Sequence, residues 1–172
     1  MYDKIPGMKR VIVIGQAPPL RPASEPFGRT RLYGWLGRIG VTRQMVRQTF
    51  LFTALVDVFP GRTGNSDKPP SRDQIVAALP RLRAFLRTSN PDIIVPVGSL
   101  AIRYALGRES ISLKNAVGKA FTKDPFGALG REVVIIPLPH PSGASPWVHL
   151  DQNEKLFQRA LARLQKELAV PN

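Results

Sequence analysis

The sequence predicts an α/β fold, a three-layer α/β/α sandwich with about four central parallel strands, in a single domain over residues 1–172. Short β-branched runs alternate along the chain with longer stretches of helical periodicity. Glycine or proline stands at or within two residues of the end of each run, as in strands that end in tight turns. The 172 residues are also enough to bury a full core without disulfides or metal.

The first part of the chain supplies two strands and a helix. Residues 9–15, KRVIVIG, form a continuous apolar run into glycine, which is typical of a central parallel strand. A helix is expected over 30–39, with Gly40 at its end. The apolar run 50–58 predicts the second strand, and a loop over 59–70 follows it.

The next helix is expected over 71–87, where Ser71 is a suitable N-cap. Pro80 lies inside this helix and could kink it. Asn-Pro then breaks the chain, and the run 92–97, DIIVPV, predicts the third strand. The expected apolar stripe of the helix comprises Ile75, Leu79, Leu82 and Leu86.

The last part of the chain begins with a short helix over 99–106. Residues 107–130 are rich in Gly, Lys and Phe and predict an irregular excursion. The run 131–137 predicts the fourth strand, and a final amphipathic helix is expected over 151–168. Its expected core positions are Leu156, Leu161, Leu164 and Leu168.

Composition narrows the classes of function. The chain has no cysteine and two histidines, which argues against thiol chemistry, disulfides, iron–sulfur clusters and histidine-rich metal sites. No apolar run is long enough to span a membrane and no signal peptide is evident, so we expect no membrane partner and a cytoplasmic protein, nucleoid-associated in a prokaryote. The net charge of +13 favours a polyanionic partner, nucleic acid first.

A histidine stands where the last predicted strand ends, in LPHPSGASPW at residues 138–147. Prolines on both sides of His140 restrict the backbone, and the small residues after it allow another chain to come close. Ligands of open α/β sheets bind at the carboxyl ends of strands, so His140 is a candidate site residue. The turn alone is equally consistent with a capping or core histidine.

Two segments together resemble the signature motifs of the uracil-DNA glycosylase superfamily. GQAP at 15–18 is similar to the GQDP and GEAPG forms, and HPSGAS at 140–145 to the HPSP and NPSG forms. EPFGR at 25–29 and VGSLA at 97–101 are similar to segments of the thermophile-type families. The resemblance spans the chain. It implies a monofunctional glycosylase that removes uracil from DNA and starts base-excision repair.

The chain also departs from these families. Ala17 stands where the first family has its water-activating aspartate, and Gln16 replaces the glutamate of GEAPG. Thr53 stands where the cysteine-containing families carry an asparagine that reads the pyrimidine, and Pro19 where the first family excludes thymine with tyrosine. The cluster cysteines are missing, with Asp57 near one such position, so no iron–sulfur cluster or other cofactor is expected. Other deaminated bases are an alternative substrate.

A glycosylase must extrude the nucleotide and hold the base against an aromatic face. By the resemblance, Phe27 is the candidate face, although a core phenylalanine is the competing interpretation. Thr53 and backbone groups of Gly15 and Ala17 are candidates to read the base edge. The remaining substrate-binding candidates, in the turn after His140, are Ser142 and Gly143.

The leaving base carries negative charge, so catalysis should depend on fixed hydrogen-bond donors. His140 is the candidate donor to the uracil O2, supported by backbone N–H groups of the following turn. Glu25 or Gln16 could orient the water. A simple ion pair of Glu25 with Arg21 or Arg29 is the competing interpretation. No lysine lies in either motif for a Schiff-base step.

The expected partner is DNA that contains uracil, bound by a monomer. Trp147 is either a wedge in the DNA or an anchor for the last helix, and the two basic candidates are either phosphate contacts or solvated charges. The DNA-binding candidates are Ala144, Ser145, Trp147, Arg62 and Lys68.

Two further functions compete with the glycosylase. A binding protein of the same fold would recognise uracil or abasic DNA without turnover, which Ala17 favours and which His140 and Glu25 disfavour. An unrelated α/β protein that binds a free nucleotide lacks support, because residues 61–68 do not have the GxxxxGK spacing.

Overall fold

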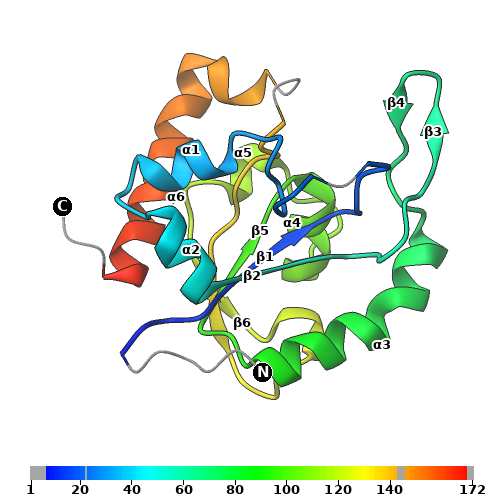
Figure 1. Ribbon diagram of the computed structural model, residues 1–172, viewed down its shortest axis with the longest axis horizontal. Helices are drawn as coiled ribbons and strands as arrows, with labels where there is room; N and C mark the ends of the chain where they lie inside the picture. The colour runs from blue at the N-terminus through cyan, green and yellow to red at the C-terminus, as the bar shows by residue number, and fades with distance from the viewer. Residues whose placement is uncertain (1–6, 22, 143–145, 170–172) are drawn as a thin grey trace.

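The computed structural model describes residues 7–21, 23–142 and 146–169, and its centre is a five-stranded sheet (Figure 1). The strand order is β2-β1-β5-β7-β6. The first four strands in this order are parallel, and β6 pairs with β7 in the antiparallel direction. The strands are β1 (Val11–Gly15), β2 (Phe50–Ala54), β5 (Ile93–Pro96), β6 (Phe121–Lys123) and β7 (Val133–Ile135).

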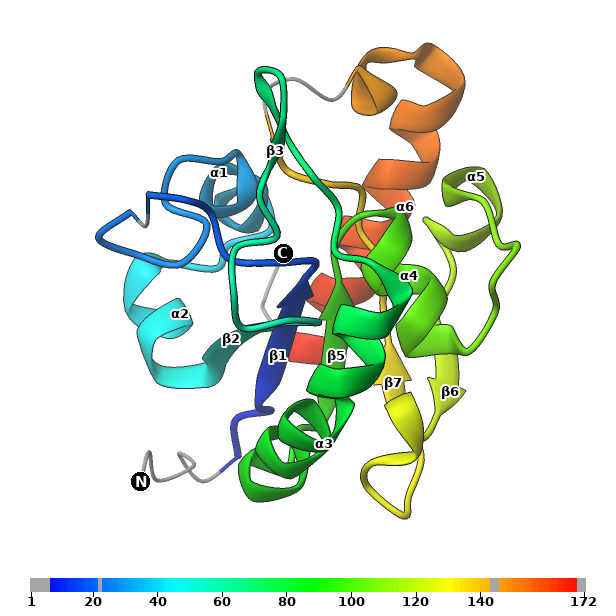
Figure 2. The same cartoon turned by 90° about the vertical axis from the view of Figure 1, so that its right-hand side faces the viewer.

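Helices cover both faces of the sheet, which gives the predicted three layers (Figure 2). On one face, Val11 and Val13 of β1 pack toward α1, α2 and α6. On the other, Ile12 and Ile14 pack toward α3 and α4. The helices are α1 (Leu32–Gly37), α2 (Arg43–Thr49), α3 (Arg72–Ser89), α4 (Ser99–Leu106), α5 (Leu113–Ala116) and α6 (Asp151–Leu168).

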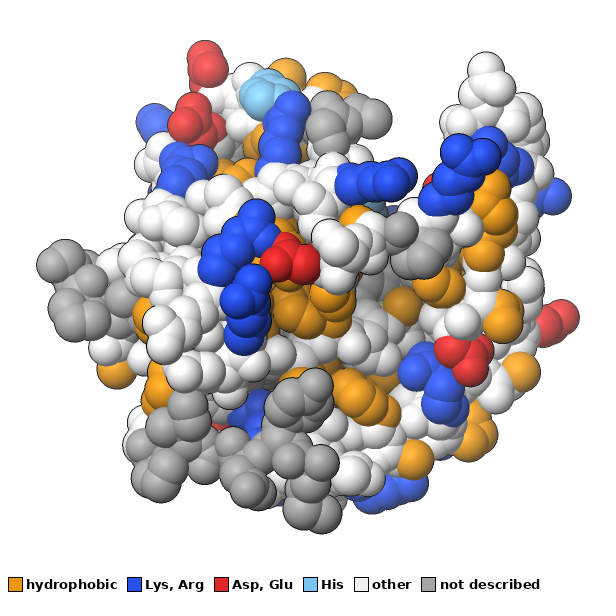
Figure 3. Space-filling model, in the orientation of Figure 1, with side chains coloured by type: hydrophobic (Ala, Val, Ile, Leu, Met, Phe, Trp, Pro, Cys, Tyr) orange, Lys and Arg blue, Asp and Glu red, His pale blue; other side chains and the backbone are white. Residues whose placement is uncertain are grey.

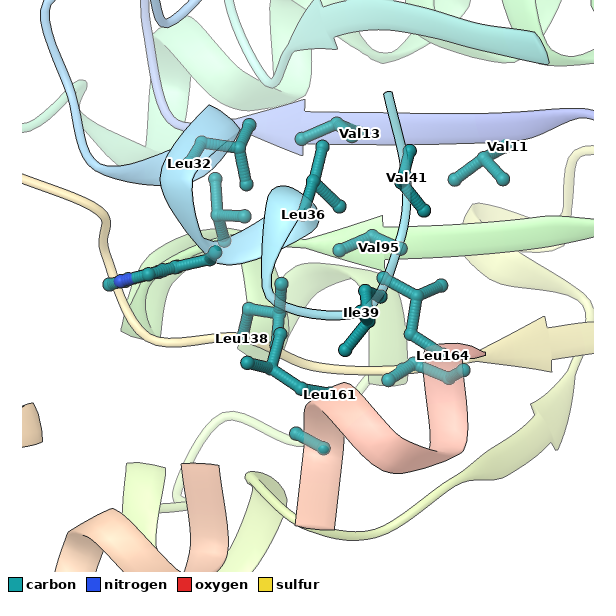
Figure 4. Close-up of a cluster of buried hydrophobic side chains, with 14 of the residues drawn as sticks. Val11, Val13, Leu32, Leu36, Ile39, Val41, Val95, Leu138, Leu161 and Leu164 are labelled. Carbon is teal, nitrogen blue, oxygen red and sulfur yellow. The ribbon is translucent and has the colours of Figure 1, made fainter. Parts of the chain in front are cut away.

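The layer of α1 and α6 forms a continuous apolar cluster with the sheet (Figure 4). Leu161 and Leu164 of α6 are buried in it as predicted, whereas Leu156 and Leu168 are only partly buried. Phe157, which was not among the predicted core positions, is 2% exposed, and its ring meets Trp35 edge-on at 4.6 Å.

The predicted helix that starts after Ser71 is present as α3. The Ser71 hydroxyl accepts from Gln74 N at 3.2 Å, and the Gln74 side chain accepts from Ser71 N at 2.8 Å, which makes a capping box. Pro80 lies inside α3, which continues past it to Ser89. The stripe is buried at Ile75, Leu82 and Leu86 and partly buried at Leu79.

Three predictions need correction. The second strand ends at Ala54 instead of residue 58, because the chain turns away after Leu55 and Val56 donate to the carbonyls of Gly15 and Gln16. Helix α2, which precedes this strand, was not predicted. The excursion 107–130 contains β6, so the sheet has a fifth, antiparallel strand at its edge.

The predicted loop 59–70 contains a small hairpin, β3 (Arg62–Thr63) paired with β4 (Ser66–Asp67). In Figure 1 it projects beyond the end of the sheet, at the upper right. Within the part of the chain that is described, no helix is both long and apolar enough to cross a membrane.

Candidate active site

A cavity of about 970 Å³ opens at the carboxyl ends of the parallel strands. Strand β1 lies between β2 and β5, so the strand that follows β1 in the sheet lies on one side of it and β5 lies on the other. Such a topological switch point is where open α/β sheets bind ligands. Basic side chains flank the hollowed region of this face, in which hydrophobic side chains are exposed (Figure 3). Residues 15–21, residues 52–54 and His140 all contribute to the wall.

The fold holds His140 in this cavity through the strand that precedes it. Leu138 pairs with Val97 and donates to Pro96 O at 3.0 Å, which carries the chain beyond the end of β7. Arg31 N, at the start of α1, then donates to Pro141 O at 2.9 Å. Hydrogen bonds therefore hold the backbone on both sides of His140 in the sequence.

A hydrogen bond from Ser142 N indicates the tautomer of His140. Ser142 N donates to Nδ1 at 3.2 Å, so Nδ1 is the unprotonated nitrogen and the ring proton lies on Nε2. Burial lowers the pKa of His140 from its ordinary value of 6.5. A neutral imidazole thus offers an Nε2–H donor to the cavity. The Ser142 N–H serves the histidine and is not free for a ligand.

Gly98 provides the space in which the imidazole lies. A Cβ atom at Gly98 would come within 3.3 Å of His140 Cδ2 and 3.4 Å of its Cβ. Gly98 also has φ of +86°, a conformation that other residues rarely adopt. It is the N-cap of α4, so one glycine both turns β5 into the helix and leaves room for the histidine.

Phe27 lines the same cavity from a strained backbone position. Its φ is +57°, which is uncommon for a residue with a bulky side chain. Thr30 N and Thr30 Oγ1 both donate to Phe27 O, at 2.9 and 2.7 Å, and hold this turn. The ring lies 3.0 Å from where a Cβ of Gly15 would be and 6.0 Å from the ring of Phe52. Backbone strain maintained beside a cavity is typical of functional sites.

Arg81 of α3 reaches the end of β2, beside Thr53. Its Nη1 donates to Thr53 Oγ1 at 3.3 Å, and its Nη2 donates to Ala54 O at 2.7 Å. Its Nε lies 3.7 Å from a carboxylate oxygen of Asp57. All four residues line the cavity. Sequence reasoning missed Arg81, because α3 contains several arginines and none is marked by a motif.

Glu25 lines the cavity and forms ion pairs with two arginines of α2. Arg43 contacts one carboxylate oxygen, and Arg47 lies 3.6 Å from the other. The expected alternative, a pair with Arg21 or Arg29, therefore named the wrong partners. Arg43 also stacks over the ring of Tyr33 at 4.3 Å, and burial raises the pKa of Tyr33, with Glu25 adding to the effect.

Gln16 and Ala17 follow β1 directly and are partly buried in the cavity wall. The carbonyl of Gln16 accepts from Val56 N at 3.4 Å. The small side chain of Ala17 packs against the cluster beneath α3.

The DNA-binding candidates lie in three different settings. Arg62 and Lys68 are exposed at the cavity rim, and Arg62 is 3.3 Å from Asp67 across the hairpin. Trp147 is partly buried against the core cluster of α6 and does not appear in the cavity wall of the described residues, as expected for an anchor of that helix. Ala144 and Ser145 lie outside the described residues, as does the substrate-binding candidate Gly143.

A comparison with known families identifies the family of the chain. No curated protein matches the chain at a significant level. The family model of the uracil DNA glycosylase superfamily matches residues 3–165 of the 172, a range that includes both strand-end motifs and the cavity between them. The chain therefore belongs to the uracil DNA glycosylase superfamily.

Proposed function

We propose that the protein is a monofunctional uracil-DNA glycosylase, which hydrolyses the bond between uracil and deoxyribose and leaves an abasic site in DNA. The observation that carries the proposal is the neutral His140, whose Nε2–H is held as a donor in a cavity that also contains an aromatic ring. Membership of the superfamily supports the same reaction.

The cavity suits a base that has been rotated out of the helix. Phe27 offers a ring on which an extruded base can stack, and stacking on an aromatic ring contributes about 1–3 kcal/mol per base. The close approach of this ring to Gly15 puts backbone groups at the end of β1 near the same base. Phe27 and Gly15 would thus hold the base, with Gln16 and Ala17 beside it.

His140 would stabilise the leaving group. As the glycosidic bond breaks, negative charge develops on the base and spreads to its O2 oxygen. A fixed donor aimed at such an oxygen typically accelerates a reaction by about 10²–10³-fold. Because Ser142 N holds Nδ1, the ring presents Nε2–H without having to reorient. Ser142 would support this role, because its backbone N–H holds the histidine.

Water must then attack the sugar carbon. Glu25 is the acid nearest the first motif in the sequence, and its ion pairs with Arg43 and Arg47 hold the carboxylate at the cavity wall, where it would orient the water. Gln16 is the second candidate, through its side-chain amide. The DNA strand itself would be held by Arg62 and Lys68 at the rim.

A cleavage assay tests the proposal. The protein is incubated with labelled single- and double-stranded DNA that contains one uracil, and abasic sites are revealed by alkali. We expect alkali-dependent scission that falls about 10²–10³-fold in His140→Ala. His149→Ala is the matched control, because this second histidine is exposed and contacts Arg31 outside the cavity wall.

Other outcomes point to other functions. Selective binding of uracil-containing DNA without scission, at any protein excess, would replace the enzyme by a binding protein, an alternative that Ala17 favours. Scission at hypoxanthine or xanthine but not at uracil would retain the enzyme and change its substrate.

A further inference from the structure

The side chain of Arg81 forms the end of the cavity that is bounded by β2. The guanidinium holds two neighbours, Thr53 Oγ1 at 3.3 Å and Ala54 O at 2.7 Å. The side chain is 35% exposed, so it is neither sealed in the core nor free in solvent. Among the described residues, its Nε is a buried side-chain nitrogen without a hydrogen-bond partner, 3.7 Å from the Asp57 carboxylate.

These contacts give this end of the cavity hydrogen-bond donors. A guanidinium has five N–H donors and no acceptor, and the bonds to Thr53 and Ala54 use one N–H of each Nη. Each Nη therefore has a second N–H. The Thr53 hydroxyl accepts from Arg81, so its own proton is available to donate elsewhere. An amino group that approached this end would face donors and a positive charge.

The strand order puts this donor edge across the cavity from His140. Gly98, against which the imidazole packs, follows β5, and Thr53 lies in β2, with β1 between the two strands. Two strand spacings amount to about 9.6 Å. These spacings separate the backbones of Gly98 and Thr53, so a base placed over the end of β1 lies between His140 on one side and Arg81 on the other. A base whose O2 meets His140 then presents its C4 substituent to Arg81.

We propose that Arg81 makes the pocket specific for a carbonyl oxygen at C4 of the pyrimidine, through its remaining Nη–H donors and through the Thr53 hydroxyl that it holds. Uracil has such an oxygen, whereas cytosine has an amino group that donates. This inference rests on the proposed function, because it names how that site selects its base. The same positive charge would stabilise the base as it leaves with negative charge on O4.

The test measures binding, so it does not depend on turnover. DNA with a 2′-fluoroarabino sugar resists cleavage and can carry uracil, cytosine or 2-pyrimidinone, which has hydrogen in place of the C4 oxygen. For the unaltered protein we expect uracil to bind at least tenfold more tightly than either other base. Arg81→Met should reduce both preferences to about threefold or less, with most of the loss in affinity for uracil.

Arg83→Met is the matched control, because Arg83 lies on the same helix and also donates to a backbone carbonyl, Phe126 O, but does not line the cavity of the described residues. It should keep both preferences. Thr53→Val alone should lower both preferences. Added to Arg81→Met, it should lower them no further. If Arg81→Met weakens binding of all three bases by the same factor, the proposal is wrong and Arg81 only supports the fold or attracts the backbone.

Two further results keep the outcomes distinct. If Arg81→Met does not fold, Arg81→Lys and Thr53→Val test the proposal instead. A lysine keeps a donor, so Arg81→Lys should retain part of the preference for uracil. Unchanged preferences in both Arg81→Lys and Thr53→Val would overturn the proposal. If the unaltered protein does not excise uracil, the proposed glycosylase function is contradicted. The ratios of binding affinity for the three bases still test the role of Arg81 in that case. Normal excision with unchanged ratios contradicts this inference alone.

Discussion

The charge state of a single imidazole controls the proposed reaction. In the proposed reaction His140 would donate from Nε2 while Nδ1 accepts from Ser142 N, and only the neutral ring can do both. Protonation would place a second proton on Nδ1, opposite the Ser142 N–H. Burial opposes that protonation, which is why the pKa of His140 is lowered from 6.5.

The pH dependence of excision should follow from this shift. Because the lowered pKa lies below 6.5, the neutral donor predominates at and above pH 6.5, and the rate should fall only as the pH drops further. The stability that the neutral ring contributes is likewise present above the unfolded pKa of about 6.5 and is lost as the pH falls toward the folded pKa. Single-turnover excision rates between about pH 8 and pH 5 measure the effect.

Variants assign the group that titrates. His140→Gln should excise uracil slowly, and its rate should no longer fall at acidic pH, the part of the profile that we call the acidic limb. Glu25→Gln should retain the acidic limb even if it lowers the rate at every pH. A limb that disappears in Glu25→Gln belongs instead to the carboxylate. A rate that already falls above pH 6.5 would contradict the direction of the shift in His140.

The pattern of strands alone predicts those site residues that are attached to a strand end, whereas Phe27, which also lines the cavity, is identified through the family resemblance. Gly15, Gln16 and His140 follow apolar runs in the sequence, and the topology of a parallel sheet brings such ends together. Arg81 comes from the middle of a helix and reaches the site through the length of its side chain. Its role depends on how α3 packs on β2, which periodicity does not define.

At the level of elements, the sequence predicts those segments whose pattern is long and consistent. The apolar stripe of α3 and the buried run of β1 are examples. Helix α2 has seven residues, too few for a clear helical repeat, and its start is marked only by Thr42, whose hydroxyl accepts from Met45 N. Strand β6 has three residues and owes its conformation to pairing with β7.

Gly98 joins β5 to α4 and contacts His140, so a substitution of this glycine tests how the packing of these elements affects the site. Gly98→Ala adds a Cβ within 3.3 Å of the His140 ring at a positive φ. The backbone strain at φ of +86° and ψ of 159° costs about 1–3 kcal/mol, and we expect the displaced imidazole to slow excision at least tenfold. Urea unfolding and single-turnover rates measure the two effects separately.

Gly127→Ala is the control for the strain alone, because Gly127 has φ of +59° and a Cβ there would meet nothing within 4 Å. It should also lose stability, but it should keep its activity. Equal losses of activity in both variants would mean that backbone strain, and not contact with His140, is responsible.

Charge acts over the whole molecule. The chain carries a net charge of +13, and part of its basic surface is already neutralised, since Glu25 pairs with Arg43 and Arg47. Arg62 and Lys68 lie at the rim of the cavity, on the hairpin side. Their Asp67 neighbour offsets part of this charge. The local arrangement, more than the net charge, therefore determines where a DNA backbone is held.

Salt dependence separates these two contributions. Each phosphate contact releases counterions and adds about 0.9 to the slope of log K against log salt for duplex DNA. If Arg62 and Lys68 each contact a phosphate, replacing both by glutamine should lower the slope by about 2 and weaken binding to uracil-containing and normal DNA alike. Replacing the exposed Arg159 and Lys166 of α6 removes the same net charge away from the cavity wall and should leave the slope nearly unchanged. Equal slopes in the two double variants would mean that the general charge of the protein attracts DNA, and that Arg62 and Lys68 are solvated charges.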